Sequence, residues 1–156
     1  MNKKINIREA TKSDIPTIVI FNELLALESE GISLDRTLLE KGVASAIEDP
    51  TKGRYFLAEI TESGIKRVSG QLMITLEWSD WRNGLFWWIQ SVYVDPQARR
   101  QGVFTALYRQ VKQMAQDDSS VCGLRLYMEQ NNATARSVYT GVGMTETPYQ
   151  VFEELF

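Results

Sequence analysis

A nearly continuous run of apolar and aromatic residues, followed by a polar turn and an amphipathic segment, constrains the fold more than any other part of this chain. The run covers residues 85–94, the turn residues 95–102 and the amphipathic segment residues 103–116. Such a run is typical of a central strand that is covered on both faces. Because an alternating strand follows at residues 122–129, the sequence predicts a parallel strand-helix-strand crossover.

The flanking segments predict further strands and helices that complete a single mixed α/β (α+β) domain over residues 1–156. Alternating apolar residues indicate strands, and capping residues before apolar stripes indicate helices. The predicted strands are residues 4–9, 55–60 and 65–78, with a hairpin turn at Glu62-Ser63-Gly64, and one or two closing strands through residues 149–152. Three further helices are predicted. The first follows a capping box at Thr11–Asp14, the second follows an N-cap at Asp35 and ends near Ile47, and the third spans roughly residues 133–140.

The chain has no histidine and a single cysteine, Cys122, and this excludes several classes of chemistry. Without imidazole there is no triad of the Ser/His/Asp kind and no usual zinc hydrolysis, so we expect no metal. One cysteine forms no internal disulfide, and no histidine or helix N-terminus adjoins it, so we expect Cys122 in the core. Catalysis must then use carboxylates, Tyr, Lys, Arg or backbone amides.

Charge and hydropathy exclude two further classes of partner. The chain carries 17 Lys and Arg against 20 Asp and Glu, a formal net charge of −3. An acidic total argues against a general nucleic-acid-binding protein. No apolar run is long enough to span a bilayer, and no apolar region follows Lys3 and Lys4, so we expect a cytosolic (cytoplasmic) protein without a membrane partner.

The turn after the central strand carries the first chemical motif, Arg99-Arg100-Gln101-Gly102. It ends a buried strand and opens a helix, where free backbone N–H groups, two arginines and a glycine that permits close approach make a cradle for phosphate. The same residues also suit a helix start with solvated arginines. Taken alone, the motif does not decide between these alternatives.

A second motif lies about thirty residues further on, at the start of the last predicted helix. Asn132 can cap this helix, Ala135 allows close packing, and Tyr139 lies two turns after Asn132 on nearly the same face. Alternatively, Asn132 is only a cap and Tyr139 is a core aromatic residue whose hydroxyl is satisfied.

Together the two motifs resemble the acetyl-CoA-binding core of the GNAT superfamily of N-acetyltransferases. The patterns that carry the resemblance are Arg99-x-x-Gly102 and Asn132-x-x-Ala135-x-x-x-Tyr139-x-x-x-Gly143-Met144. The order of the predicted elements resembles that fold over essentially the whole chain. The resemblance implies a central mixed, mostly antiparallel sheet of six to seven strands, about four helices, and one parallel strand pair splayed to hold CoA. It implies an enzyme that moves an acetyl group from acetyl-CoA to a primary amine by direct attack in a ternary complex.

The resemblance also implies which residues contact acetyl-CoA. Backbone amides of the turn would bind the pyrophosphate, the end of the central strand would pair with the pantetheine arm, and Asn132 would contact that arm. An amide N–H near Val92 could polarise the thioester carbonyl, and Tyr139 would protonate the departing thiolate. The expected cofactor-binding residues are Val92, Tyr93, Val94, Arg99, Arg100, Gln101, Gly102, Val103, Phe104, Thr105, Asn132, Ala135 and Tyr139.

Two positions depart from the pattern of the family. Phe104 stands where many members have a second glycine or alanine, so its side chain must point away from the pyrophosphate or alter the cradle. Gln90 stands where many members have a glutamate as general base, and an amide cannot accept the ammonium proton. Either a carboxylate acts through water or the amine arrives neutral. The candidate carboxylates, each of which alternatively is a solvated surface acid, are Glu28 and Glu30 at the end of the first helix and Glu77 and Asp80 near a predicted corner of the sheet.

The acceptor is the least defined part of the prediction. Glu77, Asp80 and Trp81 are the expected substrate-binding residues, because an aromatic side chain beside acids suits a cationic amine. We expect Trp87 and Trp88 to build the core instead. A small-molecule amine is the first expectation for the acceptor, and a peptide or protein amine is the alternative. A non-catalytic acyl-CoA-binding sensor that has lost its base is the alternative from another class, and the sequence leaves open whether the protein is a homodimer.

Overall fold

The computed structural model describes residues 3–156, which fall into two compact units. The first unit ends at Leu126 and contains the whole sheet, and the second unit is Tyr127–Phe156. The helices are α1 (Ile15–Glu30), α2 (Arg36–Glu48) and α3 (Val103–Asp117) in the first unit and α4 (Ala133–Gly141) in the second. Each unit therefore holds one of the two predicted motifs.

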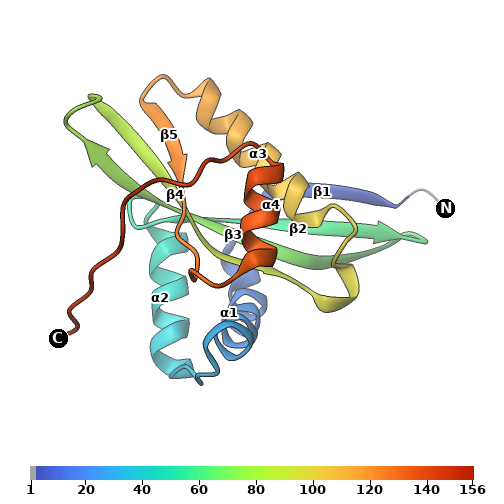
Figure 1. The fold of residues 1–156 in the computed structure, drawn as a ribbon. Helices are drawn as coiled ribbons and strands as arrows, with labels where there is room; N and C mark the ends of the chain where they lie inside the picture. The colour runs from blue at the N-terminus through green and yellow to red at the C-terminus, as the bar shows by residue number, and fades with distance from the viewer. Residues whose placement is uncertain (1–2) are drawn as a thin grey trace. The chain divides into compact units, whose positions relative to one another are not determined.

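The first unit is built on one mixed sheet of five strands in the order β1-β2-β3-β4-β5 (Figure 1). The first three pairs of neighbours are antiparallel, and β4 and β5 are parallel. Helix α3 connects β4 to β5, which confirms the predicted parallel crossover. The strands are β1 (Lys4–Glu9), β2 (Arg54–Glu62), β3 (Ile65–Ser79), β4 (Gly84–Val94) and β5 (Val121–Arg125).

Helices cover both faces of this sheet, with α1 and α2 on one face and α3 on the other (Figure 1). The core on the first face comprises Ile18, Val19, Val43, Ala46, Tyr55 and Leu57. The buried stripe of α3 comprises Val103, Leu107, Tyr108, Val111 and Ala115. The apolar run of the central strand is thus explained by cover on both faces. None of the helices in residues 3–156 combines the length and the apolar composition needed to span a membrane.

Local polar signals begin helices and turns where the sequence predicts them. Thr11 and Asp14 form a capping box at the short 3-10 turn that leads into α1. The Asp35 carboxylate accepts a backbone hydrogen bond at 3.0 Å and opens α2. Between β2 and β3, Ser63 and Gly64 have φ values of 52° and 79°, as the two central residues of a type I′ hairpin turn require.

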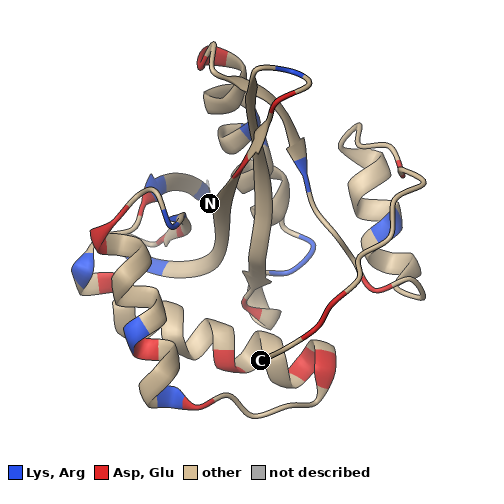
Figure 2. Cartoon of the chain, turned by 90° about the vertical axis from the view of Figure 1, so that its left-hand side faces the viewer, with Lys and Arg blue, Asp and Glu red and all other residues tan. Residues whose placement is uncertain are grey.

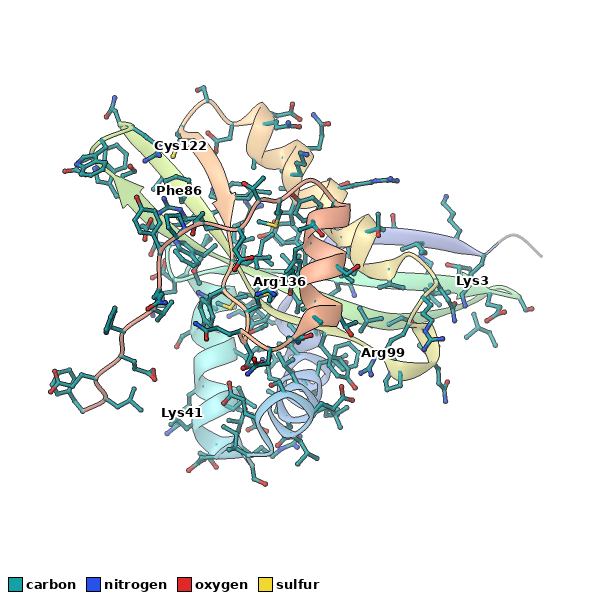
Figure 3. The ribbon with its side chains drawn as sticks, in the orientation of Figure 1. Lys3, Lys41, Phe86, Arg99, Cys122 and Arg136 are labelled. Carbon is teal, nitrogen blue, oxygen red and sulfur yellow. The ribbon has the colours of Figure 1, made fainter. Side chains whose placement is uncertain are left out.

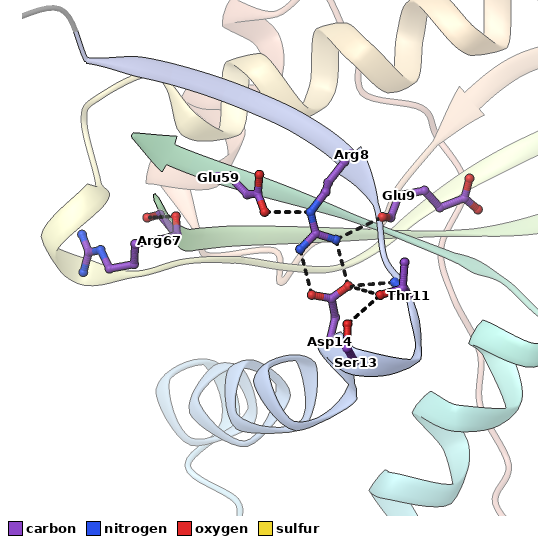
Figure 4. Close-up of polar contacts among 8 residues, drawn as sticks. Arg8, Glu9, Thr11, Ser13, Asp14, Glu59 and Arg67 are labelled. Atoms are coloured by element: carbon purple, nitrogen blue, oxygen red, sulfur yellow. Dashed lines mark hydrogen bonds and ion pairs between the residues drawn. The ribbon is translucent and has the colours of Figure 1, made fainter. Parts of the chain in front are cut away.

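A partly buried ion cluster ties β1 to the start of α1 and to β2 (Figure 4). Arg8 of β1 donates two hydrogen bonds to Asp14, both at 2.8 Å, and a third to Glu59 of β2, also at 2.8 Å. The bonds from Arg8, together with bonds from Thr11, lower the pKa of the Asp14 carboxyl to about 2. Charge-assisted bonds of this kind fix the first strand against the helix that follows it.

The sheet has five strands and not the six to seven that the resemblance implies. β5 ends at Arg125 and not at Glu129, and the predicted closing strands are absent from the described residues of the second unit. Pro148 has no N–H to donate to a strand partner. The apolar side chains after it are exposed, so strand formation there would bury little apolar surface. These side chains are Tyr149, Val151 and Phe152, which are 75%, 69% and 91% exposed.

Cys122 is exposed, so the prediction that it lies in the core is wrong (Figure 3). Leu85 of β4 pairs with Val121 and Phe86 pairs with Gly123, so Cys122 is the extra residue of a bulge. A Cβ at Gly123 would lie 2.8 Å from the Phe86 ring, so this position accepts no side chain while the ring stays in place.

Candidate functional site

The parallel strands β4 and β5 separate part-way along β4. β5 pairs with β4 only from Leu85 to Trp88, whereas β4 continues to Val94. Among the strands of residues 3–156, none pairs with this side of β4 from Ile89 onward. Such an edge presents unpaired backbone N–H and C=O groups, which can accept an extended ligand as an added strand. The structure thus contains the splayed parallel pair that was expected.

A bulge interrupts β4 within this open stretch. The register of β3 and β4 shifts here, so that Ser91 and Val92 together stand opposite one residue of β3. Ser91 has a φ of 48°, a left-handed value that residues other than glycine, Asn and Asp rarely adopt. Bulges redirect the backbone groups beside them, and the N–H of Val92, the expected oxyanion donor, belongs to this bulge.

The turn after β4 leaves the start of α3 without a side-chain cap. Asp95 accepts a hydrogen bond from the Gln97 N–H at 2.8 Å and orders the turn. Arg100 and Gly102 have left-handed φ values of 61° and 80°. Gly102 occupies the N-cap position and has no side chain to accept from the first N–H groups of α3. The first turn of α3 therefore offers backbone N–H groups to an anion.

The Arg99 side chain, labelled in Figure 3, is bound to other groups of the first unit. Its Nη2 donates to both oxygens of Glu28, at 2.7 and 3.0 Å, and its Nε donates to the Val94 carbonyl at 3.0 Å. Its guanidinium lies over the Tyr93 ring, 5.7 Å from the centroid. These contacts join the turn to the C-terminal end of α1, where acidic residues including the terminal Glu30 gather (Figure 2). Part of the positive charge of the turn is thereby neutralised within the protein.

Phe104 lies in the first turn of α3 and packs along the helix. Its ring centroid is 6.0 Å from that of Tyr108, with an angle of 33° between the ring planes. Residues four apart share one face of a helix, so this contact gives the Phe104 side chain a packed position on α3.

A row of polar side chains lies on the sheet face that α1 and α2 cover. The Gln90 amide of β4 donates to the Thr75 hydroxyl of β3 at 2.8 Å. Glu77 is two residues from Thr75 and so shares its face. Arg125 of β5 donates to Glu77 at 2.8 Å, and its guanidinium lies 3.6 Å from the centroid of the Phe86 ring. The row therefore crosses all three strands next to the point where β4 and β5 separate.

Two of the expected acceptor-binding residues, Asp80 and Trp81, lie at the tip of the β3–β4 hairpin. Asp80 accepts a hydrogen bond from the Trp81 N–H at 2.9 Å, and Trp81 is 87% exposed. Trp87 is buried at 5% exposure, as predicted, whereas Trp88 is half-buried. Trp81 is therefore not part of the core, and its role in acceptor binding stays a prediction.

In the second unit, α4 carries the second motif. The Asn132 side chain accepts a hydrogen bond from the Ala135 N–H at 2.9 Å, which confirms the predicted cap. Ala135, Tyr139 and Val142 are partly buried and are spaced by four and three residues, so they share one face. Burial raises the pKa of the Tyr139 hydroxyl.

Sequence reasoning missed Arg125 and three buried polar residues behind the bulge, Asn22, Tyr55 and Gln71. A signal existed for two of them, because Asn22 interrupts the apolar stripe of the first helix and Gln71 stands within a buried strand. A polar residue at a core position is unusual enough to mark a site. No local pattern indicates that Arg125 lies over an aromatic ring.

A family comparison decides what kind of protein this geometry belongs to. Residues 21–144, more than half of the chain, match the model of the acetyltransferase (GNAT) family. The chain belongs to the GNAT acetyltransferase family. The resemblance carried by the two motifs is thereby confirmed, and this GNAT protein is an acyltransferase.

Solved structures of other proteins resemble this GNAT acetyltransferase in fold. A protein of Clostridium difficile 630, described as a possible acetyltransferase, is 43% identical over 97% of each chain, with a TM-score of 0.87. A Clostridium acetobutylicum protein, described as a predicted acetyltransferase and solved with acetyl-CoA, shares the fold at 18% identity over 97% of this chain and 96% of that chain, with a TM-score of 0.76. An aminoglycoside acetyltransferase from an uncultured soil metagenomic sample, solved with sisomicin, does so at 15% identity over 97% of each chain, with a TM-score of 0.73. None of the curated proteins compared with the chain matches it significantly.

Proposed function

We propose that this GNAT acetyltransferase moves the acetyl group of acetyl-CoA to the primary amine of a small molecule, by direct attack in a ternary complex. One observation carries the proposal. The open edge of β4, from Ile89 to Val94, leads through a short turn into the uncapped N-terminus of α3 at Val103. The strand edge can pair with the amides of a pantetheine arm, and the helix start can bind a pyrophosphate. These two segments follow one another along the chain, just as the pantetheine arm and the pyrophosphate follow one another in CoA.

The CoA contacts that we propose follow from this order. The pantetheine arm pairs with Val92–Val94 as an added strand. The pyrophosphate accepts hydrogen bonds from N–H groups at the start of α3, where the helix dipole also favours negative charge. The proposed contacts are Val92, Tyr93, Val94, Arg99, Arg100, Gln101, Gly102, Val103, Phe104 and Thr105 in the first unit and Asn132, Ala135 and Tyr139 in the second.

The transfer forms one bond, breaks one bond and moves two protons. The amine nitrogen attacks the thioester carbonyl carbon, the C–N bond forms and the C–S bond breaks, with the charge on the acyl oxygen stabilised by the N–H of Val92. Tyr139 gives its proton to the CoA sulfur, and the ammonium proton leaves through water to a carboxylate. A tyrosine hydroxyl is protonated at neutral pH, as a proton donor must be, because its ordinary pKa is about 10.

Glu77 is the carboxylate that we assign to the ammonium proton. It lies on the face of the sheet that carries Thr75, and Thr75 accepts a hydrogen bond from Gln90 at 2.8 Å. We propose that a water beside Gln90 and Thr75 carries the proton toward Glu77. Both carboxylates accept from an arginine, but Glu28 is less suited, because Arg99 binds both of its oxygens whereas the bond from Arg125 is to one oxygen of Glu77.

The likeness to the aminoglycoside acetyltransferase solved with sisomicin supports a small-molecule acceptor. Glu77, Asp80 and Trp81 are the side chains that we propose to contact it, by charge pairing and by cation–π attraction to the exposed indole.

The test measures thiol release from acetyl-CoA with a panel of amines that includes aminoglycosides, polyamines and a peptide N-terminus. We expect turnover with at least one small amine and a loss of about 100- to 1,000-fold in Tyr139→Phe. Turnover with the peptide alone would contradict the small-molecule acceptor. An acyl-CoA sensor would instead bind CoA tightly in calorimetry, show no turnover with any amine, and be unaffected in CoA binding by Tyr139→Phe. The presence of Gln90 in place of a carboxylate would suit such a sensor.

A further inference from the structure

We propose that three buried polar residues, Asn22, Tyr55 and Gln71, position the bulge of β4 so that the N–H of Val92 faces the acyl carbonyl. They act as positioning residues, because their effect passes through the backbone of β4 and needs no contact with acetyl-CoA. The inference rests on the proposed function, since it assigns these residues to the oxyanion donor of that reaction.

The three residues form one hydrogen-bonded cluster behind the bulge. The Gln71 side-chain amide donates to the Asn22 Oδ1 at 2.9 Å and to the Ser91 carbonyl at 3.1 Å. The Asn22 amide donates to the Tyr55 hydroxyl at 3.3 Å, and Tyr55 is also hydrogen-bonded to Ser91. Helix α1 and strands β2 and β3 thus contribute one residue each, and two of the three contact Ser91 directly.

The cluster is buried and leaves one polar atom unsatisfied. Gln71, Tyr55 and Asn22 are 0%, 5% and 7% exposed. Gln71 Oε1 is buried and accepts no hydrogen bond within the described chain. A buried acceptor without a donor costs free energy that an apolar residue would avoid. The amide is therefore held in the orientation that serves Asn22 and Ser91, although this leaves Oε1 without a donor.

The backbone of Ser91 adds a second cost at the same place. Its φ of 48° is unfavourable for a residue with a Cβ and persists only when the surrounding structure enforces it. Strained backbone and unsatisfied buried groups are typical of places where geometry serves function and not stability. Both occur here: the unsatisfied atom belongs to Gln71, which donates the hydrogen bond, and the strained backbone belongs to Ser91, which accepts it.

One peptide plane connects the cluster to the expected oxyanion donor. The Ser91 carbonyl and the Val92 N–H belong to the same planar trans unit, in which C=O and N–H point in opposite directions. Because the Gln71 side chain holds the carbonyl, the Val92 N–H points away from that side chain, and we infer that it faces the edge of β4 opposite β3. The side of β4 that faces away from β3 is the open edge, where the thioester of the proposed complex lies.

Gln71→Met tests the inference, because methionine has a similar length and no amide. We expect kcat to fall about 100-fold, since a misplaced group at the reacting centre costs about this much. The KM for acetyl-CoA and the Kd for CoA should stay within about twofold, because the lost interaction acts in the transition state. In a backbone ¹H–¹⁵N spectrum, the resonance of the Val92 amide should be displaced.

Ser69→Ala is the matched control. Ser69 lies on the same strand as Gln71, is 0% exposed, and donates to the Arg67 carbonyl at 3.2 Å. Its loss should leave kcat and the Val92 resonance unchanged. Tyr55→Phe removes a single hydroxyl of the cluster and provides a second test if Gln71→Met does not fold. We expect Tyr55→Phe to lower kcat about three- to tenfold and to displace the same resonance.

Unchanged kcat in folded Gln71→Met would overturn the inference, and so would a loss of activity equal to the unfolded fraction seen by circular dichroism. Failure of the proposed function is distinguishable, because the wild-type protein would then turn over no amine at all. In that case the inference is still tested by the Val92 amide resonance of Gln71→Met. An undisplaced resonance would refute it.

Discussion

Glu28 and Arg99 form an ion pair that joins the end of α1 to the turn before α3. The two residues are 71 positions apart in the sequence, and the Arg99 Nη2 lies 2.7 and 3.0 Å from the two oxygens of Glu28. The pair places a carboxylate beside the turn that we propose to bind the CoA pyrophosphate. It therefore weakens the attraction that this turn exerts on a phosphate.

Glu28→Gln should tighten CoA binding by about two- to fivefold, because half-exposed ion pairs are worth no more than about 1 kcal/mol. Arg99→Ala should weaken CoA binding by a similar factor. Isothermal titration calorimetry measures both effects, which should shrink as the salt concentration rises. Glu30→Gln, at the end of the same helix, is the control and should leave the Kd unchanged. A kcat loss of about 100-fold in either Glu variant would instead assign the proton transfer to that carboxylate.

Glu77→Gln should lower kcat by about 100-fold, as expected on removal of a group that accepts a proton. Steady-state kinetics should show that kcat falls while the KM for acetyl-CoA is unchanged. Asp80→Asn, on the same hairpin, removes a charge that we propose to pair with the acceptor, so it should raise the KM for the amine and retain kcat. An equal loss in Arg125→Met would contradict the prediction, because it would trace the effect to the ion pair and not to the carboxylate.

Gly102→Ala should weaken CoA binding and lower stability by about 1 kcal/mol, because the left-handed conformation is unfavourable for a residue with a Cβ. The φ of Gly102 is 80°. Gly42→Ala is the control, since no atom lies within 4 Å of a Cβ at that helical position. It should raise stability by up to about 1 kcal/mol and leave CoA binding unchanged. Urea unfolding and calorimetry measure the two quantities, and equal CoA affinity in both variants would argue against the proposed phosphate site.

Asp14 makes stability depend on acid pH. Hydrogen bonds from Arg8 lower the pKa of Asp14 to about 2 from an ordinary value of 3.8. Because the pKa is lower in the folded state, the stabilisation is present at neutral pH and is lost as the pH falls from about 4 to about 2.

Asp14→Asn should therefore lower the free energy of unfolding at pH 7 by about 2 kcal/mol and flatten its dependence on pH below 4. Urea unfolding between pH 2.5 and about pH 7 measures this. Glu48→Gln, which removes the exposed pair with Lys12, should change stability by less than about 0.5 kcal/mol. A pH dependence of Asp14→Asn identical to that of the wild type would contradict the role of Asp14.

Elements that depend on local contacts could be predicted from the sequence. The caps at Asp35 and Asn132 each accept from an N–H three residues further on, so a short motif contains the whole interaction. The crossover from β4 to β5 follows from one apolar run and one amphipathic helix, and both have a clear period. The first CoA motif is also local, because a turn and a glycine are enough to expose backbone amides at the start of a helix.

Features that depend on register or on distant partners could not be predicted. The bulges at Ser91 and Cys122 each shift the pairing by one residue, and alternation of apolar residues does not indicate where such a shift occurs. Gln71 binds Asn22 across 49 positions of sequence, so neither residue identifies the other. The exposed segment after Pro148 carries apolar side chains, but these alone supply no strand partner.

An uncovered strand edge also pairs with strands of other molecules, which is a common start of aggregation. From Ile89 to Val94, β4 has such an edge. The bulge at Ser91 breaks the even spacing of N–H and C=O groups along it, so a regular strand of another molecule can match only part of the edge. We therefore expect the irregularity that we assign to catalysis also to limit pairing of this edge with other molecules.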